Sequence, residues 1–408
     1  MLITLSRKLK KKTDYLSGMN KTNKPFKAAL FIAFFLFAFN ANAQHEALKQ
    51  KLQAKLDSFC IAGKFPGLTL GVALPDGNTL AFASGMADSS KHIPMTTDSY
   101  LMQGSVGKTY VSAIVMQLVK EGKFSLDDKV SKYLGHYPWF SRLPNAPDIT
   151  IKMLMSHTSG IMRYEFKPAF TKDLTNNPDK IWKPEELLAY VFDEKPAFKA
   201  GEGWEYSDTN YIVLAMIMEQ VTGSEYYDLL RKRILQPYHL AQTKPSNQRK
   251  LQGLVQGYAG KDNDFGGRSE VIGDDGRFII NPQFEWTGGG IYSTSRDLAK
   301  WAKLLYEGRV FDPAMLAVME EGTPAKMLGP NTSYGLGVII RQSAKYGTFY
   351  GHSGFFPGYM TEMYYFPRYK MAFAVQTNTS DYRNMKISAL KVLLEMAKTT
   401  FEESPKSN

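Results

Sequence analysis

Residues 105–121 have the sequence SVGKTYVSAIVMQLVKE, in which apolar side chains are spaced nearly all the way round a helix. A helix that is apolar on every side is buried, so this one should lie in the core of its domain. Gly122 follows it, and a glycine at this point ends a helix. The chain has 408 residues, which is enough to enclose such a helix in one large domain or two lobes.

Strand patterns occur on both sides of this helix, towards the two ends of the chain. They cover residues 68–74, 79–84, 334–341, 359–366 and 371–377. Asp76-Gly77 between the first two segments predicts an antiparallel hairpin, and Pro367 marks the turn between the last two. The sheet should therefore combine both ends of the chain.

The middle of the chain is predicted to be mainly helical. Periodic apolar residues predict helices over residues 45–59, 211–222 and 387–398, and Thr150 can cap another. Residues 260–276 are rich in Gly and Asp and predict a loop.

The predicted fold class is α/β of the α+β type. We expect an antiparallel sheet flanked by helices, built from both chain ends, with an inserted, mainly helical lobe. The α/β lobe should comprise about residues 44–124 plus 286–400, and the helical lobe about residues 125–285. A cleft between two such lobes is where a site would normally lie.

The basic character of the chain is concentrated in residues 1–43. This segment contains eight of the 50 Lys and Arg and one of the 39 Asp and Glu, which leaves 42 basic residues, 38 acidic residues and a net charge of +4. The body of the protein is therefore not expected to bind nucleic acid.

The same segment has the pattern of an export signal. A basic stretch precedes twelve apolar residues, 28–39, and Ala41-Asn42-Ala43 matches a small-x-small cleavage site. Twelve apolar residues are short for a membrane span of about 20, so we expect cleavage after Ala43, no stable membrane anchor and a periplasmic or secreted protein. An uncleaved N-terminal anchor is the alternative. Either Met1 or Met19 could be the start.

Metal and cofactor chemistry finds no support in the sequence. Cys60 is the single cysteine, which excludes an internal disulfide and a cysteine-based zinc cluster. The six histidines are far apart, and neither H-E-x-x-H nor a phosphate-binding glycine loop occurs.

Nucleophilic chemistry is indicated by Ser105 and Lys108. On a helix, residues three apart share a face, so the lysine can reach the serine hydroxyl, which needs such a partner to become a nucleophile. The same pattern recurs at Ser388 and Lys391, where an exposed amphipathic helix is expected. On its own, the first copy is equally consistent with a helix-start serine beside a solvated lysine.

Two further segments favour a site. In Tyr206-Ser207-Asp208, the phenolate of Tyr206 would become accessible beside cations and could then act as a base. His352-Ser353-Gly354, placed between a loop and the strand at residues 359–366, supplies hydrogen-bond donors beside a flexible glycine. Alone, His352 would be assigned as a hydrogen-bonded turn residue. A separate histidine, His157, is assigned a structural role.

Together, the order S-x-x-K, Y-x-N-like, then H-S-G resembles the class C β-lactamase and D-Ala-D-Ala carboxypeptidase superfamily of penicillin-binding-protein-like serine hydrolases. The segments at residues 154–161, 204–211, 287–290 and 351–358 are also similar to that superfamily. The resemblance covers about residues 50–400.

The resemblance implies a role for each motif residue. Ser105 would form an acyl-enzyme, and Lys108 and Tyr206 would share the proton transfers, with the choice of base open. The remaining assignments are as follows: the backbone N–H groups of Ser105 and Phe355 as oxyanion hole, and Asp208, His352, Ser353 and Gly354 as substrate-binding residues. No cofactor is implied, and the expected partner is a small-molecule or peptide substrate, such as cell-wall peptide or a β-lactam.

Two departures from the superfamily pattern bear on the substrate. His352 occupies the position where β-lactamases of this type carry Lys, and Asp208 the position where Asn is commoner. Both disfavour an efficient β-lactamase. We therefore expect an exported serine hydrolase acting on D-amino-acid peptide or related amide and ester bonds. A weak β-lactamase, a small-ester esterase and a non-catalytic penicillin-recognising sensor module are the alternatives, and the oligomeric state stays open.

Overall fold

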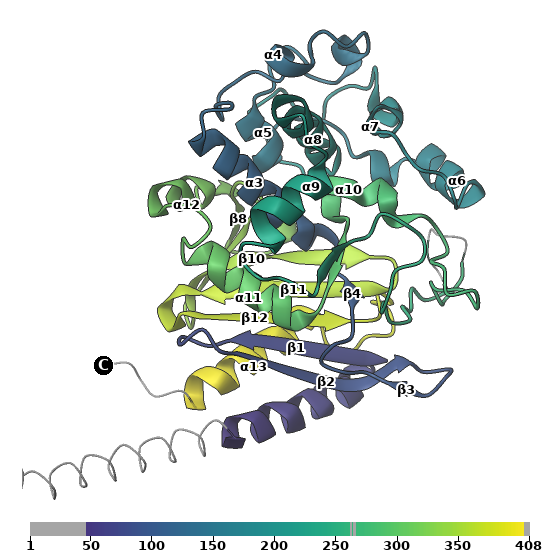
Figure 1. Ribbon diagram of the computed structural model, residues 1–408, viewed down its shortest axis with the longest axis vertical. Helices are drawn as coiled ribbons and strands as arrows, with labels where there is room; N and C mark the ends of the chain where they lie inside the picture. The colour runs from purple at the N-terminus through teal and green to yellow at the C-terminus, as the bar shows by residue number, and fades with distance from the viewer. Residues whose placement is uncertain (1–45, 262, 264–266, 404–408) are drawn as a thin grey trace, which may run out of the picture. The chain divides into compact units, whose positions relative to one another are not determined.

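Nine strands form one antiparallel sheet in the computed structural model, which describes residues 46–261, 263 and 267–403 (Figure 1). The order across the sheet is β3-β2-β1-β12-β11-β10-β9-β8-β7. The strands are β1 (Gly67–Ala73), β2 (Thr79–Asp88), β3 (Ile93–Pro94), β7 (Thr323–Pro324), β8 (Thr332–Tyr334), β9 (Ile339–Ser343), β10 (Gly347–Phe356), β11 (Tyr359–Phe366) and β12 (Met371–Thr377). The predicted signal segment and its cleavage site after Ala43 lie outside the described residues.

Strands from the early and late parts of the chain pair inside this sheet. β1 pairs with the last strand, β12, with Leu70 opposite Val375. Every residue of β1 and of β12 is buried, so both faces are covered by other elements. A Cβ added to Gly71 would lie 1.9 Å from the carbonyl oxygen of Ser295, so only glycine lets helix α11 (Ser295–Tyr306) lie this close to β1.

Helices from the middle of the chain and from its end complete the described fold. They are α3 (Lys108–Lys120), α4 (Ser131–Leu134), α5 (Ile151–Ser156), α6 (Pro168–Asn176), α7 (Pro184–Leu188), α8 (Thr209–Thr222), α9 (Tyr226–Leu230), α10 (Trp286–Gly289), α11, α12 (Pro313–Met319) and α13 (Ala389–Glu403). A further helix covers residues 46–63. A small sheet of order β4-β6-β5 adds β4 (Leu101–Met102), β5 (Thr243–Pro245) and β6 (Ile291–Ser293).

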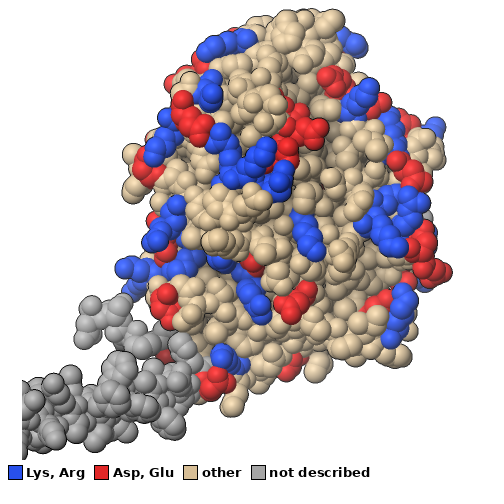
Figure 2. Space-filling view, in the orientation of Figure 1, with Lys and Arg blue, Asp and Glu red and all other residues tan. Residues whose placement is uncertain are grey.

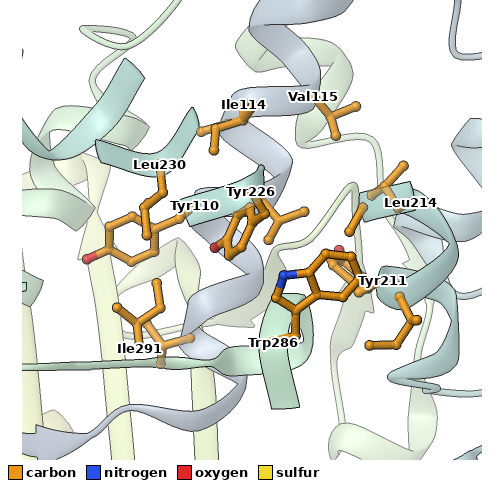
Figure 3. Close-up of a cluster of buried hydrophobic side chains, with 14 of the residues drawn as sticks. Tyr110, Ile114, Val115, Tyr211, Leu214, Tyr226, Leu230, Trp286 and Ile291 are labelled. Atoms are coloured by element: carbon orange, nitrogen blue, oxygen red, sulfur yellow. The ribbon is translucent and has the colours of Figure 1, made fainter. Parts of the chain in front are cut away.

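Helix α3 lies at the centre of the core, as its apolar sequence predicts. Figure 3 shows Tyr110 and Ile114 of α3 packed among side chains from several other elements. These are Tyr211 and Leu214 of α8, Tyr226 and Leu230 of α9, Trp286 of α10 and Ile291 of β6. The indole nitrogen of Trp301 donates to Thr109 at 2.8 Å, which ties α11 to the same helix. The first residues of α3 are therefore held from several directions.

Most predicted elements occur where expected, and two differ. Strands β11 and β12 have the predicted bounds, and Thr150 caps α5 by accepting from the Met153 N–H. The predicted strand over residues 334–341 is instead split into β8 and β9, because Gly337, at φ +76°, turns the chain between them. The segment around His352, expected to lie between a loop and the strand at residues 359–366, is itself part of the long strand β10. Its glycines, which disfavour strands, hid the pattern.

The surface of the described part has mixed charge. Figure 2 shows Lys and Arg interspersed with Asp and Glu over the face it presents. This distribution agrees with the small net charge of the body of the chain. No helix within the described residues is both long and apolar enough to cross a membrane.

Candidate active site

Ser105 and Lys108 meet where the chain enters α3. Ser105 lies in a single 3₁₀ turn, Gly104–Gly107, and Lys108 is the first residue of the α-helix. Lys108 Nζ donates to Ser105 Oγ at 3.1 Å and also to the carbonyl oxygen of Gly288. Its third close partner is Asp208, whose Oδ1 is 2.5 Å away. The lysine is fully buried, so its charge depends on these contacts.

The charge state of Lys108 is set by Asp208. Burial lowers the pKa of Lys108. The carboxylate of Asp208 and the nearby Tyr206 raise it by a larger amount, so the pKa lies above its ordinary value. Lys108 is therefore an ammonium at neutral pH. In the resting site it donates a hydrogen bond to Ser105 and does not accept one.

Tyr206 lies against the same ammonium. Lys108 Nζ is 5.0 Å from the centre of the tyrosine ring. Burial raises the pKa of Tyr206, and although Lys108 lowers it, the net direction is upward. The expectation that neighbouring cations make the phenolate accessible is therefore wrong for the resting site, because burial outweighs them. Tyr206 is a neutral hydroxyl there.

His157 packs against the ring of Tyr206. Its ring centre is 4.3 Å from that of Tyr206, and its Nδ1 accepts from the Ser207 N–H at 3.3 Å. Burial, followed by the charge of Lys108, lowers the pKa of His157 well below its usual range. A neutral, fully buried imidazole at a left-handed helix end agrees with the structural role predicted for it.

His352 lies near Tyr206, with ring centres 6.1 Å apart, but both of its ring nitrogens are engaged within the fold. Nδ1 donates to the Ser353 carbonyl oxygen at 2.6 Å, so Nε2 accepts from the hydroxyl of Tyr334 at 2.9 Å. Burial lowers the pKa of His352 to about 3. The expected contact between His352 and a substrate carboxylate therefore lacks both a charge and a free donor.

Strand β10 brings the Phe355 backbone beside the serine. A Cβ on Gly354 would lie 1.9 Å from the Gln103 carbonyl oxygen, and one on Gly104 would lie 2.4 Å from that of Phe355. Only glycines permit this approach. It places the backbones of Ser105 and Phe355, the expected oxyanion-hole pair, in neighbouring segments.

A cavity of about 940 Å³ opens above Ser105. Its described lining holds four carboxyl groups, from Glu165, Asp208, Glu285 and Glu362. The cationic lining residues are Arg163, Lys172 and Arg341, and Arg163 pairs with Glu165 at 2.8 Å. The described lining around Ser105 therefore holds more carboxyl groups than cations.

Three of these carboxyl groups were not singled out from the sequence. Burial raises the pKa of Glu165 and of Glu362 to about 7, and that of Glu285 well above its usual range. A signal existed for Glu362, since it is the lone charged residue in strand β11, whose other residues are aromatic or apolar except for Thr361. Glu285 precedes the Thr287–Gly290 segment, but nothing in its spacing marks a site.

The rim of this cavity is apolar and exposed. Its exposed large apolar side chains are Phe166, Met327, Phe355 and Tyr382, with exposed fractions of 53–80%. The guanidinium of Arg163 lies 4.0 Å from the centre of the Phe166 ring. An apolar rim around an acidic interior suits a ligand with an apolar group and a donor.

Comparison with known protein families places this geometry in context. A family model described as Beta-lactamase matches residues 46–395. Among solved structures, the D-amino acid amidase from Ochrobactrum anthropi SV3 complexed with D-phenylalanine is 27% identical, with a TM-score of 0.72 over 88% of this chain and 100% of that chain. A D-stereospecific amidohydrolase from Streptomyces sp. is 25% identical, with a TM-score of 0.71 over 84% of this chain and 97% of that one.

Curated relatives are similar at the level of sequence. Penicillin-binding protein 4* of Bacillus subtilis is 26% identical over 330 residues, which are 77% of this chain and 68% of that protein. Teichoic acid D-alanine hydrolase of Staphylococcus aureus is 27% identical over 265 residues, 64% of this chain and 59% of that protein. The chain spans 48–68% of the length of the first curated relatives that it matches.

Proposed function

The chain belongs to the β-lactamase family of serine hydrolases, and we propose that it hydrolyses D-aminoacyl amide and related ester bonds through an acyl-enzyme on Ser105. The observation that carries this proposal is the 3.1 Å contact of Ser105 Oγ with the buried Lys108 ammonium, at the base of the cavity. Both D-specific structural neighbours are named for amide substrates.

The protonation states of Lys108 and Tyr206 in the resting site determine the proposed mechanism. Lys108 is an ammonium and Tyr206 a neutral hydroxyl, so neither is an ionised base before substrate binds. We propose that Tyr206 accepts the proton of Ser105 while it passes its own proton to the leaving nitrogen, as the C–O bond to Ser105 forms and the C–N bond breaks. The Lys108 ammonium stabilises the negative charge that develops on the serine and tyrosine oxygens. Water then attacks the acyl-enzyme, a proton returns to Ser105 through Tyr206, and the carboxylic acid is released.

The substrate class follows from the cavity lining. An ionised Asp208 accepts hydrogen bonds only, so it repels an acylamino carbonyl and tolerates a free ammonium. The carboxyl group of Glu165, whose pKa of about 7 leaves it partly ionised at neutral pH, adds an acceptor to this surface. We therefore favour D-amino acid amides with a free ammonium over N-acylated penicillins. The apolar rim favours a large apolar side chain on that amino acid.

Labelling and kinetics test the proposal together. A fluorophosphonate probe should label wild-type protein and not Ser105→Ala. D-phenylalanine amide should be hydrolysed with a higher kcat/KM than nitrocefin, p-nitrophenyl acetate or L-phenylalanine amide. A weak β-lactamase would instead have the higher kcat/KM for nitrocefin, and an esterase would have the higher kcat/KM for p-nitrophenyl acetate. A non-catalytic penicillin-recognising module would turn over none of the substrates.

The rim offers a separate check on the apolar side chain. Phe166→Ala should raise KM for D-phenylalanine amide roughly tenfold or more and leave D-alanine amide unchanged, since burying an aromatic group contributes about 1.5–3 kcal/mol. Ile181→Ala is the matched control, because Ile181 is also exposed but is outside the described cavity lining. An equal effect of both variants would remove the rim from the proposal.

We further propose that the protein is exported, with residues 1–43 as a cleaved signal. The support is the basic stretch, the short apolar run and Ala41-Asn42-Ala43. Intact mass of the protein from the extracytoplasmic fraction should match a chain beginning at Gln44. A mass that retains residues 19–43 would indicate an N-terminal anchor.

A further inference from the structure

A chain of hydrogen bonds runs along the cavity wall beside the nucleophile. Arg341 Nε on β9 donates to the Tyr364 hydroxyl at 2.9 Å. The hydroxyls of Tyr364 and Ser353 are 3.2 Å apart. Ser353 Oγ then donates to Glu362 Oε2 at 2.6 Å, directly across the β10–β11 register.

When Glu362 is ionised, the chemistry of the two ends fixes the direction of this chain. A guanidinium only donates and a carboxylate only accepts. Tyr364 therefore accepts from Arg341 and gives its proton to Ser353, which gives its own proton to Glu362. A hydroxyl has a single proton, so Ser353 keeps only a lone pair for a ligand.

Two other polar groups on this wall, His352 and Arg341, are held largely by contacts within the fold. His352 uses both ring nitrogens inside the fold. Arg341 is committed through Nε to Tyr364, and through Nη1 to the Leu328 carbonyl oxygen at 3.1 Å and to Thr332 Oγ1 at 3.2 Å. Glu362 itself is 7% exposed and lines the cavity together with Ser353 and Ser105.

We infer that the Ser353–Glu362 pair is a specificity determinant that selects leaving groups offering a hydrogen-bond donor and rejects those carrying a carboxylate. The accepted class is simple amides and peptide amides. The rejected class is peptides that end in a free carboxylate. This inference rests on the proposed function for its substrate, and it assigns Glu362 a positioning role because it acts through Ser353.

Ligand binding to a Ser105→Ala protein tests the inference without relying on turnover. D-alanyl-glycinamide and D-alanyl-glycine differ only in a terminal carboxamide or carboxylate, and their Kd values can be compared by calorimetry. The amide should bind at least about tenfold more tightly, because a hydrogen bond to a charged group would be reversed for the acid. Equal affinities, or tighter binding of the acid, would overturn the inference.

Glu362→Gln in the same background should reduce this preference roughly tenfold, mainly by tightening the acid. The side-chain amide can donate to Ser353, which frees the serine proton for the ligand. Glu320→Gln is the matched control. Burial also raises the pKa of Glu320 to about 7, but Glu320 is not among the described cavity residues. An unchanged preference in Glu362→Gln, or the same change in both variants, would contradict the assignment.

The pH dependence supplies a readout that a purely structural role would not move. Burial raises the pKa of Glu362 to about 7, while Ser353 and Arg341 lower it. Its protonation removes the negative charge, so affinity for the acid should rise as pH falls through 7. The groups that interact with it are Arg341 of β9, Ser353 of β10 and Tyr364 of β11, and burial raises the pKa of Tyr364 to about 12.

This pH-dependent rise should disappear in Glu362→Gln. Because Glu165, whose pKa is also about 7, is unchanged in that variant, a rise that persists would assign the effect to Glu165 and overturn the inference. If Glu362→Gln does not fold, Ser353→Ala replaces it and should weaken the amide severalfold while the acid stays weak. The proposed function fails separately, if wild-type protein hydrolyses no substrate and takes no label.

Discussion

The chain contains the same Ser-x-x-Lys spacing in two places that differ in every other respect. Lys108 is fully buried and touches Ser105, Gly288 and Asp208. Lys391 is exposed, and Ser388 accepts a hydrogen bond from its backbone N–H at 3.2 Å, which makes Ser388 the cap of α13. Spacing brings a serine and a lysine onto one helix face, but a reactive pair also needs burial and partners from distant parts of the chain.

The partners that separate the two copies come from far along the chain. Asp208 precedes α8 and Gly288 lies in α10, and both reach the start of α3 because α3 is packed in the core. Placing an ammonium there without a counter-charge would cost several kcal/mol. The first copy is therefore a site that the whole fold supports, and the second is a local feature of one helix.

Removing the two serines should give the largest contrast. Ser105→Ala should lower kcat/KM by several orders of magnitude and abolish covalent labelling, because it removes the nucleophile. Ser388→Ala should leave both unchanged. Activity lost with Ser388 and kept without Ser105 would reverse the assignment of the site.

Removing the two lysines should separate charge from spacing. Lys108→Met should reduce the rate roughly 10²–10³-fold, the contribution of one group that stabilises the charge developing in the transition state. It should also lower the free energy of unfolding by about 3 kcal/mol, because the carboxylate of Asp208 loses its partner. Urea unfolding measures the second effect.

The double variant Lys108→Met with Asp208→Asn isolates the cause of that instability. It should recover part of the lost stability without recovering activity, since the unpaired charge is gone. Lys391→Met should change neither quantity by more than about 0.5 kcal/mol or its equivalent in rate. A stable Lys108→Met single variant would show that the ion pair contributes little.

The counter-ion itself is the next contrast. Asp208→Asn supplies an amide that can donate to an acylamino carbonyl, so acylation by ordinary penicillins should rise roughly 10- to 150-fold. Simple esters lack that carbonyl and should gain less. The measurement is the second-order acylation rate for each substrate type. Equal changes for both, or a loss for penicillin, would leave Asp208 as a plain structural partner of Lys108.

The comparison also shows what sequence reasoning could reach. The buried helix, the bounds of β11 and β12 and the cap at Thr150 follow from local periodicity and side-chain chemistry, so they were predictable. The split of β8 from β9 and the strand around His352 depend on glycines whose effect is set by neighbouring strands.

The features of the site also fall into those that the local sequence predicts and those that depend on the fold. The pairing of Ser105 with Lys108 is local and was predicted from spacing. The burial of His352, the upward shift in the pKa of Tyr206 and the role of Glu362 depend on contacts across the fold. Desolvation is a property of the packed structure, so a motif alone gave the wrong charge state for Tyr206.

The smallest predicted effect concerns the second copy of the pattern. If Ser388 is only a cap, Ser388→Ala should lower the free energy of unfolding by about 1 kcal/mol, because the Lys391 N–H loses its acceptor at the exposed start of α13. Ser388→Asp should retain the cap and add a favourable charge near the positive end of the helix, so its stability should equal or exceed that of wild type. Both variants should keep wild-type kcat/KM. Thermal unfolding with parallel assays checks this, and a loss of activity at unchanged stability would show that the exposed copy does more than begin a helix.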